Sequence, residues 1–505
     1  MRFNISIRKT KLVINYEGEK AFALTPEMEL YTAVVTTALS DQFYEKSDKR
    51  LDRICTLIGQ CDAIFVARLA VYAREVMNLR SVPLVLVVEL AKLHQGDNLI
   101  SRLTSRVVQR ADEITELLAL YGQANSRTGF KQLNRLSKQV QKGLAISFNM
   151  FDEYQFAKYN RTAQVTLKDA LFLVHPMAKD EAQQALFDKI AQDELATPYT
   201  WETELSALGQ LRYVSEEVKR SAFTEKWEEL IFSKRLGYMA TLRNLRNMLE
   251  AGVSREAIDA VCEYLSDAKA VAKSRQLPFR FLSAYRELKS VQHGLVSKVL
   301  EALEKAVLHS AANIAGYDED TRVVIAADIS GSMQRVISAK SKVQNYDIGL
   351  MLAMLLQHRC GNVITGMFGD TWKVINLSRN QVLANVDEFH RREGEVGYST
   401  NGYLVIKDLL DRRQRVDKVM VFTDCQLWNS HSGAENIGNL WSQYKRIAPQ
   451  AKLYLFDLIG YGMAPLNVQR NDVYLIAGWS DKVFDVLNAV DQGSDALKMI
   501  NSIEL

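Results

Sequence analysis

The chain has 505 residues, of which 48% are hydrophobic and 24% are charged, as in an ordinary globular protein with more than one core. This composition excludes wholesale disorder and fibrous repeats. The longest uncharged apolar stretches, 82–88 and 348–356, are far shorter than the roughly 20 residues that cross a bilayer, so we expect no membrane partner. Residues 1–20 lack the apolar core of a secretory signal, which predicts a cytoplasmic protein.

Three common enzyme signatures are missing from the sequence. It has no HExxH, GxxxxGK[ST] or GxGxxG motif, and its five cysteines form no CxxC pair. This argues against the usual zinc-protease, nucleoside-triphosphate and dinucleotide sites. We expect the cysteines to be reduced, and most of them to lie in the core.

The net charge of +3 conceals an uneven distribution, because residues 101–150 form the most basic block of the chain. Lysines and arginines that recur every three or four residues fall on one face of a helix, where they could follow a phosphate backbone. A solvated helix face is the alternative explanation. The candidate RNA-binding residues of this block are Arg127, Lys131, Arg135, Lys138 and Lys142.

The pattern from Pro26 to about Ala312 is helical almost throughout. Stretches such as 62–77, 237–249 and 254–265 show the three- and four-residue apolar spacing of short amphipathic helices. No fixed repeat period is present, but a degenerate HEAT-like stack needs only alternating apolar faces. We therefore expect an all-α helical-repeat domain over residues 1–316.

Strand runs and helical segments alternate after residue 316. Residues 321–328 form the first apolar strand run, followed by a helical stretch at 342–358, and four further strand runs come later. This alternation predicts a doubly wound α/β domain with a mainly parallel sheet over residues 317–505.

Hard oxygen ligands follow two of these strand runs. Asp328, Ser330 and Ser332 follow the first run, Asp424 ends a later one, and Thr400 lies in a Gly-bounded loop between them. Ligands gather at the carboxyl ends of the strands in such sheets, and carboxylates and hydroxyls suit Mg²⁺ or Mn²⁺. We predict a divalent cation at these five residues, with one coordination position open.

Two enzyme interpretations of the same loop do not fit. A haloacid-dehalogenase-type phosphatase has a second Asp where this chain has Ser330, and a nucleophile elbow has Gly where it has Asp328. We predict that the chain is not an enzyme. The DxSxS motif, the threonine loop and the later Asp instead resemble the metal-ion-dependent adhesion site of von Willebrand factor A domains, apart from Asn401, where many A domains have Asp or Gly.

Three sequence segments of the helical region resemble the TROVE module of the Ro autoantigen family. They lie at 158–176, where KYNR leads to LKDALFLVHP, at 239–248 (MATLRNLRNM) and at 277–288 (LPFRFLSAYREL). The resemblance implies a monomeric ring of HEAT-like repeats closed by the A domain. It also implies that Lys158 and His175 belong to an RNA-contacting cavity, with Arg161 and Lys168 in the same basic stretch.

The family resemblance further implies a function in RNA quality control. Members bind small structured Y RNAs on the outer surface, and single-stranded 3′ ends of misfolded RNAs enter the central hole. Bacterial members resemble subunits that deliver RNA to an exoribonuclease such as polynucleotide phosphorylase. The alternative hypothesis is a metal-dependent protein-interaction module, whose open cation position captures an acidic residue of a partner.

Overall fold

The computed structural model describes residues 11–37, 42, 44–125, 136–160, 163–312, 314–339, 341–429 and 435–505. The chain divides into two compact units. We call residues 1–57, 277–283 and 307–499 the sheet unit, and residues 58–276, 284–306 and 500–505 the helical unit. The N-terminal residues thus belong to the same unit as the C-terminal strands. The predicted boundary at residue 316 stays a prediction.

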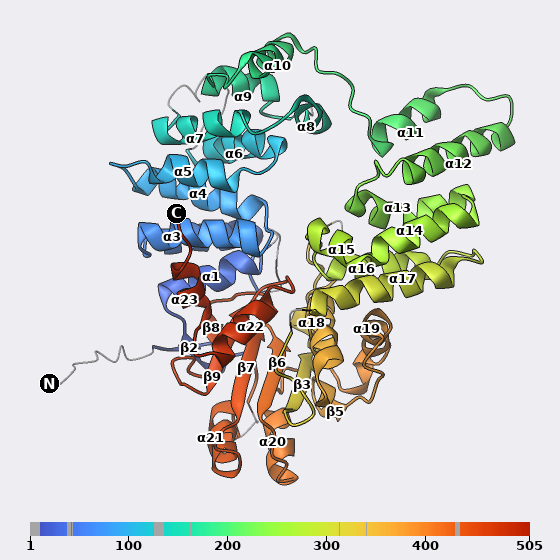
Figure 1. Ribbon diagram of the computed structural model, residues 1–505. Coiled ribbons are helices and arrows are strands. Elements are labelled where there is room, and N and C mark those ends of the chain that lie inside the picture. Colours follow the sequence, from blue (N-terminus) through green and yellow to red (C-terminus); the bar gives the residue numbers. More distant parts are fainter. Residues whose placement is uncertain are drawn as a thin grey trace. The chain divides into compact units, whose positions relative to one another are not determined.

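The helical unit consists of short helices, as the apolar spacing predicts, and α3 to α7 pack each on a neighbour along the chain (Figure 1). A π-helical turn, η1 (Tyr72–Val76), continues the first of them. The helices are α3 (Ala63–Val71), α4 (Ser81–Leu93), α5 (Leu99–Val107), α6 (Ala111–Ala124), α7 (Lys138–Phe148), α8 (Glu153–Tyr159), α9 (Leu167–Val174), α10 (Glu181–Gln192), α11 (Trp201–Gln210), α12 (Glu216–Phe232), α13 (Tyr238–Ala251), α14 (Arg255–Ser266) and α15 (Ala268–Ser274).

Side chains of Asp, Ser and Thr mark where many of these helices begin. Asp152, Thr166 and Ser254 each accept a hydrogen bond from a backbone N–H in the first turn of the helix that follows. Such caps satisfy donors that a helix end would otherwise leave free.

Three more helices contribute residues to both units: α16 (Phe279–Lys289), α17 (Val296–Leu308) and α23 (Ala496–Asn501).

The sheet unit contains a six-stranded sheet in the order β5-β4-β3-β6-β7-β9 (Figure 1). All neighbouring pairs are parallel except β4 and β5. The strands are β3 (Arg322–Asp328), β4 (Asn362–Phe368), β5 (Trp372–Val374), β6 (Lys418–Thr423), β7 (Lys452–Asp457) and β9 (Val473–Ala477). Five of these six strands coincide with the predicted strand runs, and the sheet is mainly parallel, as expected.

Helices lie between these strands and after the last one, at the predicted places. They are α18 (Asn345–Arg359), α19 (Val382–Arg391), α20 (Tyr403–Asp411), α21 (Ile437–Ile447) and α22 (Val483–Asp491), with short 3-10 turns η3 (His309–Ala311), η4 (Gly331–Gln334) and η5 (Glu393–Glu395). Val324, Val421 and Leu455 share one face of the sheet with buried residues of α20 and α21. Phe422 points to the opposite face, where α18 packs.

The N-terminal part of the sheet unit adds a small antiparallel sheet and two helices. Its strands β1 (Leu12–Ile14) and β2 (Lys20–Ala23) pair with β8 (Met463–Ala464). Helices α1 (Pro26–Val35) and α2 (Ser47–Ile58) follow, and α1 packs on β9. The sequence pattern indicated only the first of these helices.

Two further findings bear on the sequence predictions. None of the five cysteines forms a disulfide within the described residues, and Cys262, Cys360 and Cys425 are buried. Among the residues that the structure describes, no helix is long and apolar enough to cross a membrane.

Candidate functional site

The carboxyl edge of the large sheet brings two of the predicted cation ligands onto adjacent strands. Asp328 ends β3, and Asp424 directly follows β6, its parallel neighbour. The chain order of the strands reverses between β3 and β6, which makes this the topological switch point of the sheet. Ligands of doubly wound sheets bind in the crevice at such a point.

All five predicted cation ligands are buried at this edge: Asp328, Ser330, Ser332, Thr400 and Asp424. The backbone N–H of Ser330 donates to Oδ1 of Asp328 at 3.0 Å, and the hydroxyl oxygens of Ser330 and Ser332 are 3.2 Å apart. The DxSxS loop is therefore folded back on its own carboxylate, with its hydroxyls side by side.

Two oxygen atoms of this group have no hydrogen-bond partner among the described residues. They are Oγ1 of Thr400 and Oδ2 of Asp424, and both are fully buried. The other carboxylate oxygen of Asp424 accepts a 2.9 Å hydrogen bond from the backbone N–H of Gln426. Because a buried polar atom without a partner is costly, free hydroxyl and carboxylate oxygens at one sheet edge fit a hard divalent cation.

The charged forms of the two aspartates are disfavoured by their surroundings. Burial raises the pKa of Asp328 to about 6. Burial and, next, the charge of Asp328 raise the pKa of Asp424 to about 8. A cation between them would remove both penalties. No group of three or more His, Cys, Asp or Glu side chains that could hold a metal occurs in the described part of the chain, so a site here depends on the hydroxyls.

The structure adds residues that sequence reasoning missed. The hydroxyl of Thr423 donates a 2.6 Å hydrogen bond to Oδ2 of Asp328 and thereby orients that carboxylate. Asp457 ends the next strand, β7, and is fully buried with Oδ2 unpartnered among the described residues. Burial raises the pKa of Asp457 to about 6. Its place directly at the end of a strand run was the signal that could have found it.

The predicted RNA-binding residues lie in the helical unit. Lys158 is exposed on α8, with its Nζ 5.5 Å from the ring centroid of Tyr154 and 5.7 Å from that of Tyr159. His175 is exposed at the end of α9, and its backbone is in the left-handed conformation. Its backbone N–H donates to the carbonyl of Leu171. Lys168 forms a 2.6 Å ion pair with Asp193.

The basic block differs from the single helix that its spacing suggested. Helix α7 begins at Lys138, so only Lys138 and Lys142 share it, and residues 136–137 before it are not helical. Both lysines are exposed. The correction arises because spacing alone cannot locate a helix start. Four further predicted residues lie outside the described residues: Arg127, Lys131, Arg135 and Arg161.

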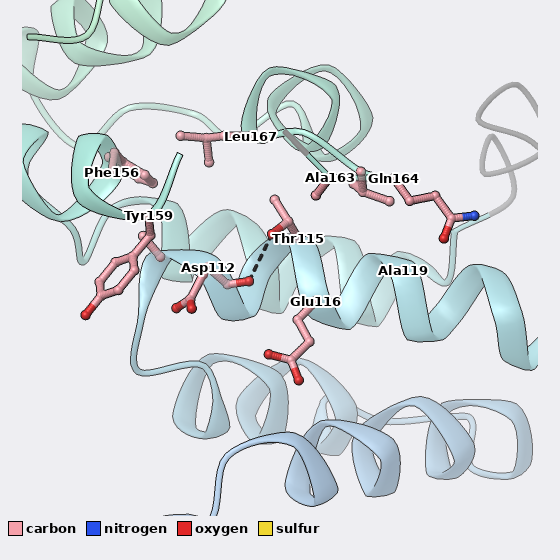
Figure 2. A pocket seen from close by; sticks show the side chains of 11 residues that line it. Asp112, Thr115, Glu116, Ala119, Phe156, Tyr159, Ala163, Gln164 and Leu167 are labelled. Carbon is pink, nitrogen blue, oxygen red and sulfur yellow. Dashed lines mark hydrogen bonds between the residues drawn. The ribbon is translucent and has the colours of Figure 1, made fainter. Parts of the chain in front are cut away.

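A pocket of about 200 Å³ lies between α6, α8 and the chain that leads into α9 (Figure 2). Its lining is mostly apolar, with Tyr159 at one side and Asp112 and Glu116 on α6. The Arg110 guanidinium pairs with Asp112 at 3.0 Å and lies 4.3 Å from the ring centroid of Tyr159. Arg110 and Lys158 thus lie beside the rings of Tyr159 and Tyr154, and cations beside aromatic rings are a combination that single-stranded nucleic acid can bind.

Comparisons with known proteins place the chain in a family. The TROVE domain family matches residues 28–203 and 191–347. Telomerase protein component 1 of Rattus norvegicus is 24% identical over 326 residues, which cover 49% of this chain and 12% of that protein. The same protein of Mus musculus is 24% identical over 323 residues, or 48% of this chain and 12% of that protein. The chain thus spans about an eighth of the length of these curated relatives.

One solved structure shares the fold. The crystal structure of the RO (RSR) protein of Deinococcus radiodurans superimposes with a TM-score of 0.58 at 18% sequence identity, covering 93% of this chain and all of that one. The TROVE match extends over more than half of the chain. The chain therefore belongs to the TROVE family, which is the family of Ro proteins and of RNA-binding ribonucleoprotein components.

Proposed function

We propose that the chain is the scaffold of a ribonucleoprotein that binds a small Y-like RNA and the single-stranded 3′ ends of misfolded or precursor RNAs. It would present these RNAs for maturation or decay to an exoribonuclease such as polynucleotide phosphorylase. The observation that carries the proposal is the TROVE match over residues 28–347, which includes the exposed lysines of α7 and α8.

The electrostatics of these lysines support the proposal. Lys138, Lys142 and Lys158 are exposed and make no ion pair with any described residue. Each phosphate that a cation neutralises in a single strand contributes about −0.7 to the slope of log affinity against log salt. Tyr154, 44% exposed beside Lys158, offers a ring on which a base could stack for roughly 1 to 3 kcal/mol.

A binding titration tests the RNA-binding surface. Fluorescence anisotropy would follow a structured RNA with a single-stranded 3′ tail at several salt concentrations. The double variant Lys158→Ala with His175→Ala should bind at least tenfold more weakly than the unchanged chain at low salt, and with a shallower salt slope. The control variant Lys219→Ala with His94→Ala removes the same residue types where Lys219 is paired with Glu216 and His94 is hydrogen-bonded to Asp97, and it should bind normally. Salt-insensitive or absent binding by the unchanged chain would refute the proposal.

We extend the proposal to the architecture. The helices would be HEAT-like repeats that form a ring, closed by a von Willebrand factor A-type domain that contains the six-stranded sheet. The similarity to the Deinococcus radiodurans RO (RSR) structure supports this arrangement at the level of the fold. Electron cryomicroscopy of the purified chain tests it, because an open rod of helices would contradict a ring.

A second candidate function concerns the cation site. Asp328, Ser330, Ser332, Thr400 and Asp424 would hold Mg²⁺ or Mn²⁺, and an open coordination position would take a carboxylate of a protein partner. The two unpartnered buried oxygens of Thr400 and Asp424 favour this proposal. A bound cation supplies positive charge that holds a carboxylate group. Asp328→Ala should abolish Mn²⁺ binding and spare RNA binding, whereas the Lys158 and His175 double variant should do the reverse.

A further inference from the structure

The turn between β1 and β2, residues 15–19, is fastened to the loop that follows β6, residues 424–429. Three hydrogen bonds join them: the side-chain amide of Asn15 to the carbonyl of Leu427 at 2.9 Å, the backbone N–H of Tyr16 to Oε1 of Gln426 at 3.0 Å, and the side-chain amide of Asn429 to Oε2 of Glu19 at 2.6 Å. Both segments belong to the sheet unit. The turn thus holds the 424–429 loop at three points.

The 424–429 loop is also bonded to both predicted cation ligands that keep an unpartnered oxygen. Asp424 begins the loop, and Gln426 donates to it twice: from its backbone N–H to Oδ1 at 2.9 Å and from its side-chain amide to the carbonyl at 3.3 Å. The backbone N–H of Trp428 donates to the carbonyl of Thr400 at 2.9 Å. Oδ2 of Asp424 and Oγ1 of Thr400 are buried without a hydrogen-bond partner among the described residues. The position of the loop therefore sets where both free oxygens lie.

The 424–429 loop contains a strained backbone conformation. Cys425, between Asp424 and Gln426, has a φ of +63° and is fully buried. A residue other than glycine rarely takes this left-handed conformation, because its Cβ comes too close to the following carbonyl oxygen. Such conformations persist only where surrounding contacts hold them, and they cluster at functional sites. The hydrogen bonds from the β1–β2 turn are contacts that can hold this one.

Asn15 connects the two segments through one buried side chain. It is 5% exposed, and its Oδ1 accepts hydrogen bonds from the backbone N–H groups of Glu17 at 3.1 Å and Glu19 at 2.8 Å. Its side-chain nitrogen is the donor to Leu427. The oxygen thus fixes the turn, and the nitrogen fixes the loop. An ionised aspartate at this position would keep the first set of bonds and lose the second, because it has no donor.

We propose that Asn15 is a positioning residue of the cation site, which holds the 424–429 loop so that Asp424 and Thr400 present their free oxygens to one divalent cation. The inference rests on the cation site proposed above. Residues that orient metal ligands contribute a factor of roughly 10 to 100 to metal affinity. The coupling is reciprocal, so a bound cation that fixes the loop also stabilises the contacts between the loop and the β1–β2 turn.

Mn²⁺ binding to the full chain, measured by electron paramagnetic resonance, tests the proposal. Asn15→Asp should lower the affinity roughly tenfold, although the added negative charge would by itself attract a cation. Asn385→Asp on α19 is the matched control, because Asn385 is also buried and donates its side-chain amide to a carbonyl, that of Ser378 at 2.5 Å. It should bind Mn²⁺ like the unchanged chain. Equal losses of affinity in the two variants would overturn the proposal, since general destabilisation of the sheet unit would then explain both.

Hydrogen exchange followed by mass spectrometry gives a second measurement, which does not depend on the folding of an Asn15 variant. Mn²⁺ should slow the exchange of backbone amides in residues 12–23 of the unchanged chain, and Asp328→Asn should abolish this effect. Exchange that is unaltered by bound Mn²⁺ would contradict the coupling.

The outcomes separate the role of Asn15 from the existence of the cation site. Unaltered Mn²⁺ affinity in Asn15→Asp, with binding lost in Asp328→Asn, would overturn the role of Asn15 alone. Failure of the unchanged chain to bind Mn²⁺ would overturn the cation site together with this inference.

Discussion

The hydroxyl of Tyr31 donates a 3.1 Å hydrogen bond to the carbonyl of Ala477 and accepts one from the N–H of the same residue at 3.3 Å. Tyr31 is fully buried on α1, and Ala477 ends β9, 446 positions later in the chain. The first long helix of the sheet unit is therefore fastened to its last strand, and residues near the N-terminus help to complete the core around the C-terminal sheet.

Removal of this hydroxyl should destabilise the sheet unit. Tyr31→Phe leaves a buried N–H and a buried carbonyl without their partner, which costs about 1 to 3 kcal/mol. Chemical denaturation followed by circular dichroism measures the loss. Tyr474→Phe on the same strand is the control, because within the described residues its hydroxyl bonds only to the nearby and exposed carbonyl of Asn471. We expect it to change stability by less than about 0.5 kcal/mol. Equal losses of unfolding free energy in Tyr31→Phe and Tyr474→Phe would show that the Tyr31 hydrogen bonds do not stabilise the sheet unit.

The hydrogen bond from Thr423 to Asp328 predicts a contrast between two threonines. Thr423→Val removes the donor that orients a buried carboxylate, so Mn²⁺ affinity should fall roughly 10- to 100-fold. Thr365→Val on β4 is a matched control, since Thr365 is equally well buried but its hydroxyl has no partner among the described residues. That change should be neutral or stabilising. Calorimetric titration with Mn²⁺ measures both effects, and equal affinities for the two variants would contradict the orienting role.

The raised pKa values of Asp328 and Asp424 predict that the stabilisation of the fold by a bound cation depends on pH. Both carboxyls have folded-state pKa values, about 6 and about 8, above the usual value near ~4 of an unfolded chain. The folded state therefore binds protons more tightly, and this stability is present below about pH 4 and lost as the pH rises through 6 and 8. At high pH, Mg²⁺ bound at the proposed site would take the place of these protons.

We expect Mg²⁺ to raise the melting temperature more at pH 8 than at pH 5. Differential scanning calorimetry with and without Mg²⁺ at the two pH values measures the difference. Asp328→Asn should remove the gain at both. A gain that is independent of pH, or that survives in this variant, would mean that Mg²⁺ binds elsewhere.

A buried ion pair should control the stability of the helical unit. Arg74 donates to both carboxylate oxygens of Glu113, at 2.8 and 2.9 Å, and burial lowers the pKa of Arg74. Glu113→Gln leaves the arginine charge buried and only partly compensated, so we expect a loss of about 3 to 5 kcal/mol in unfolding free energy. Glu89→Gln, which breaks a more exposed pair with Lys92, should cost less than about 1 kcal/mol. Urea denaturation compares the two, and similar losses would argue against the importance of the buried pair.

Much of the fold follows from short-range sequence patterns. The apolar runs at 321–328 and 418–423 become β3 and β6, because a strand buried on both faces needs a continuous run of apolar side chains. The helical region could also be predicted from its pattern, because the apolar spacing along residues 237–249 indicates the helix that the structure has as α13. The short edge strand β5 was not predicted, because three residues carry too little pattern.

The candidate site could likewise be predicted only in part from the sequence. The residue types of the DxSxS loop and of Asp424 follow from the sequence, as does their position after strands. Only the tertiary structure decided that Asp424 keeps an unpartnered oxygen and that Thr423 orients Asp328, because these facts depend on strand register and burial. The hydrogen bonds of Asn15 to Leu427 and of Tyr16 to Gln426 likewise join residues 412 and 410 positions apart, which no local pattern encodes.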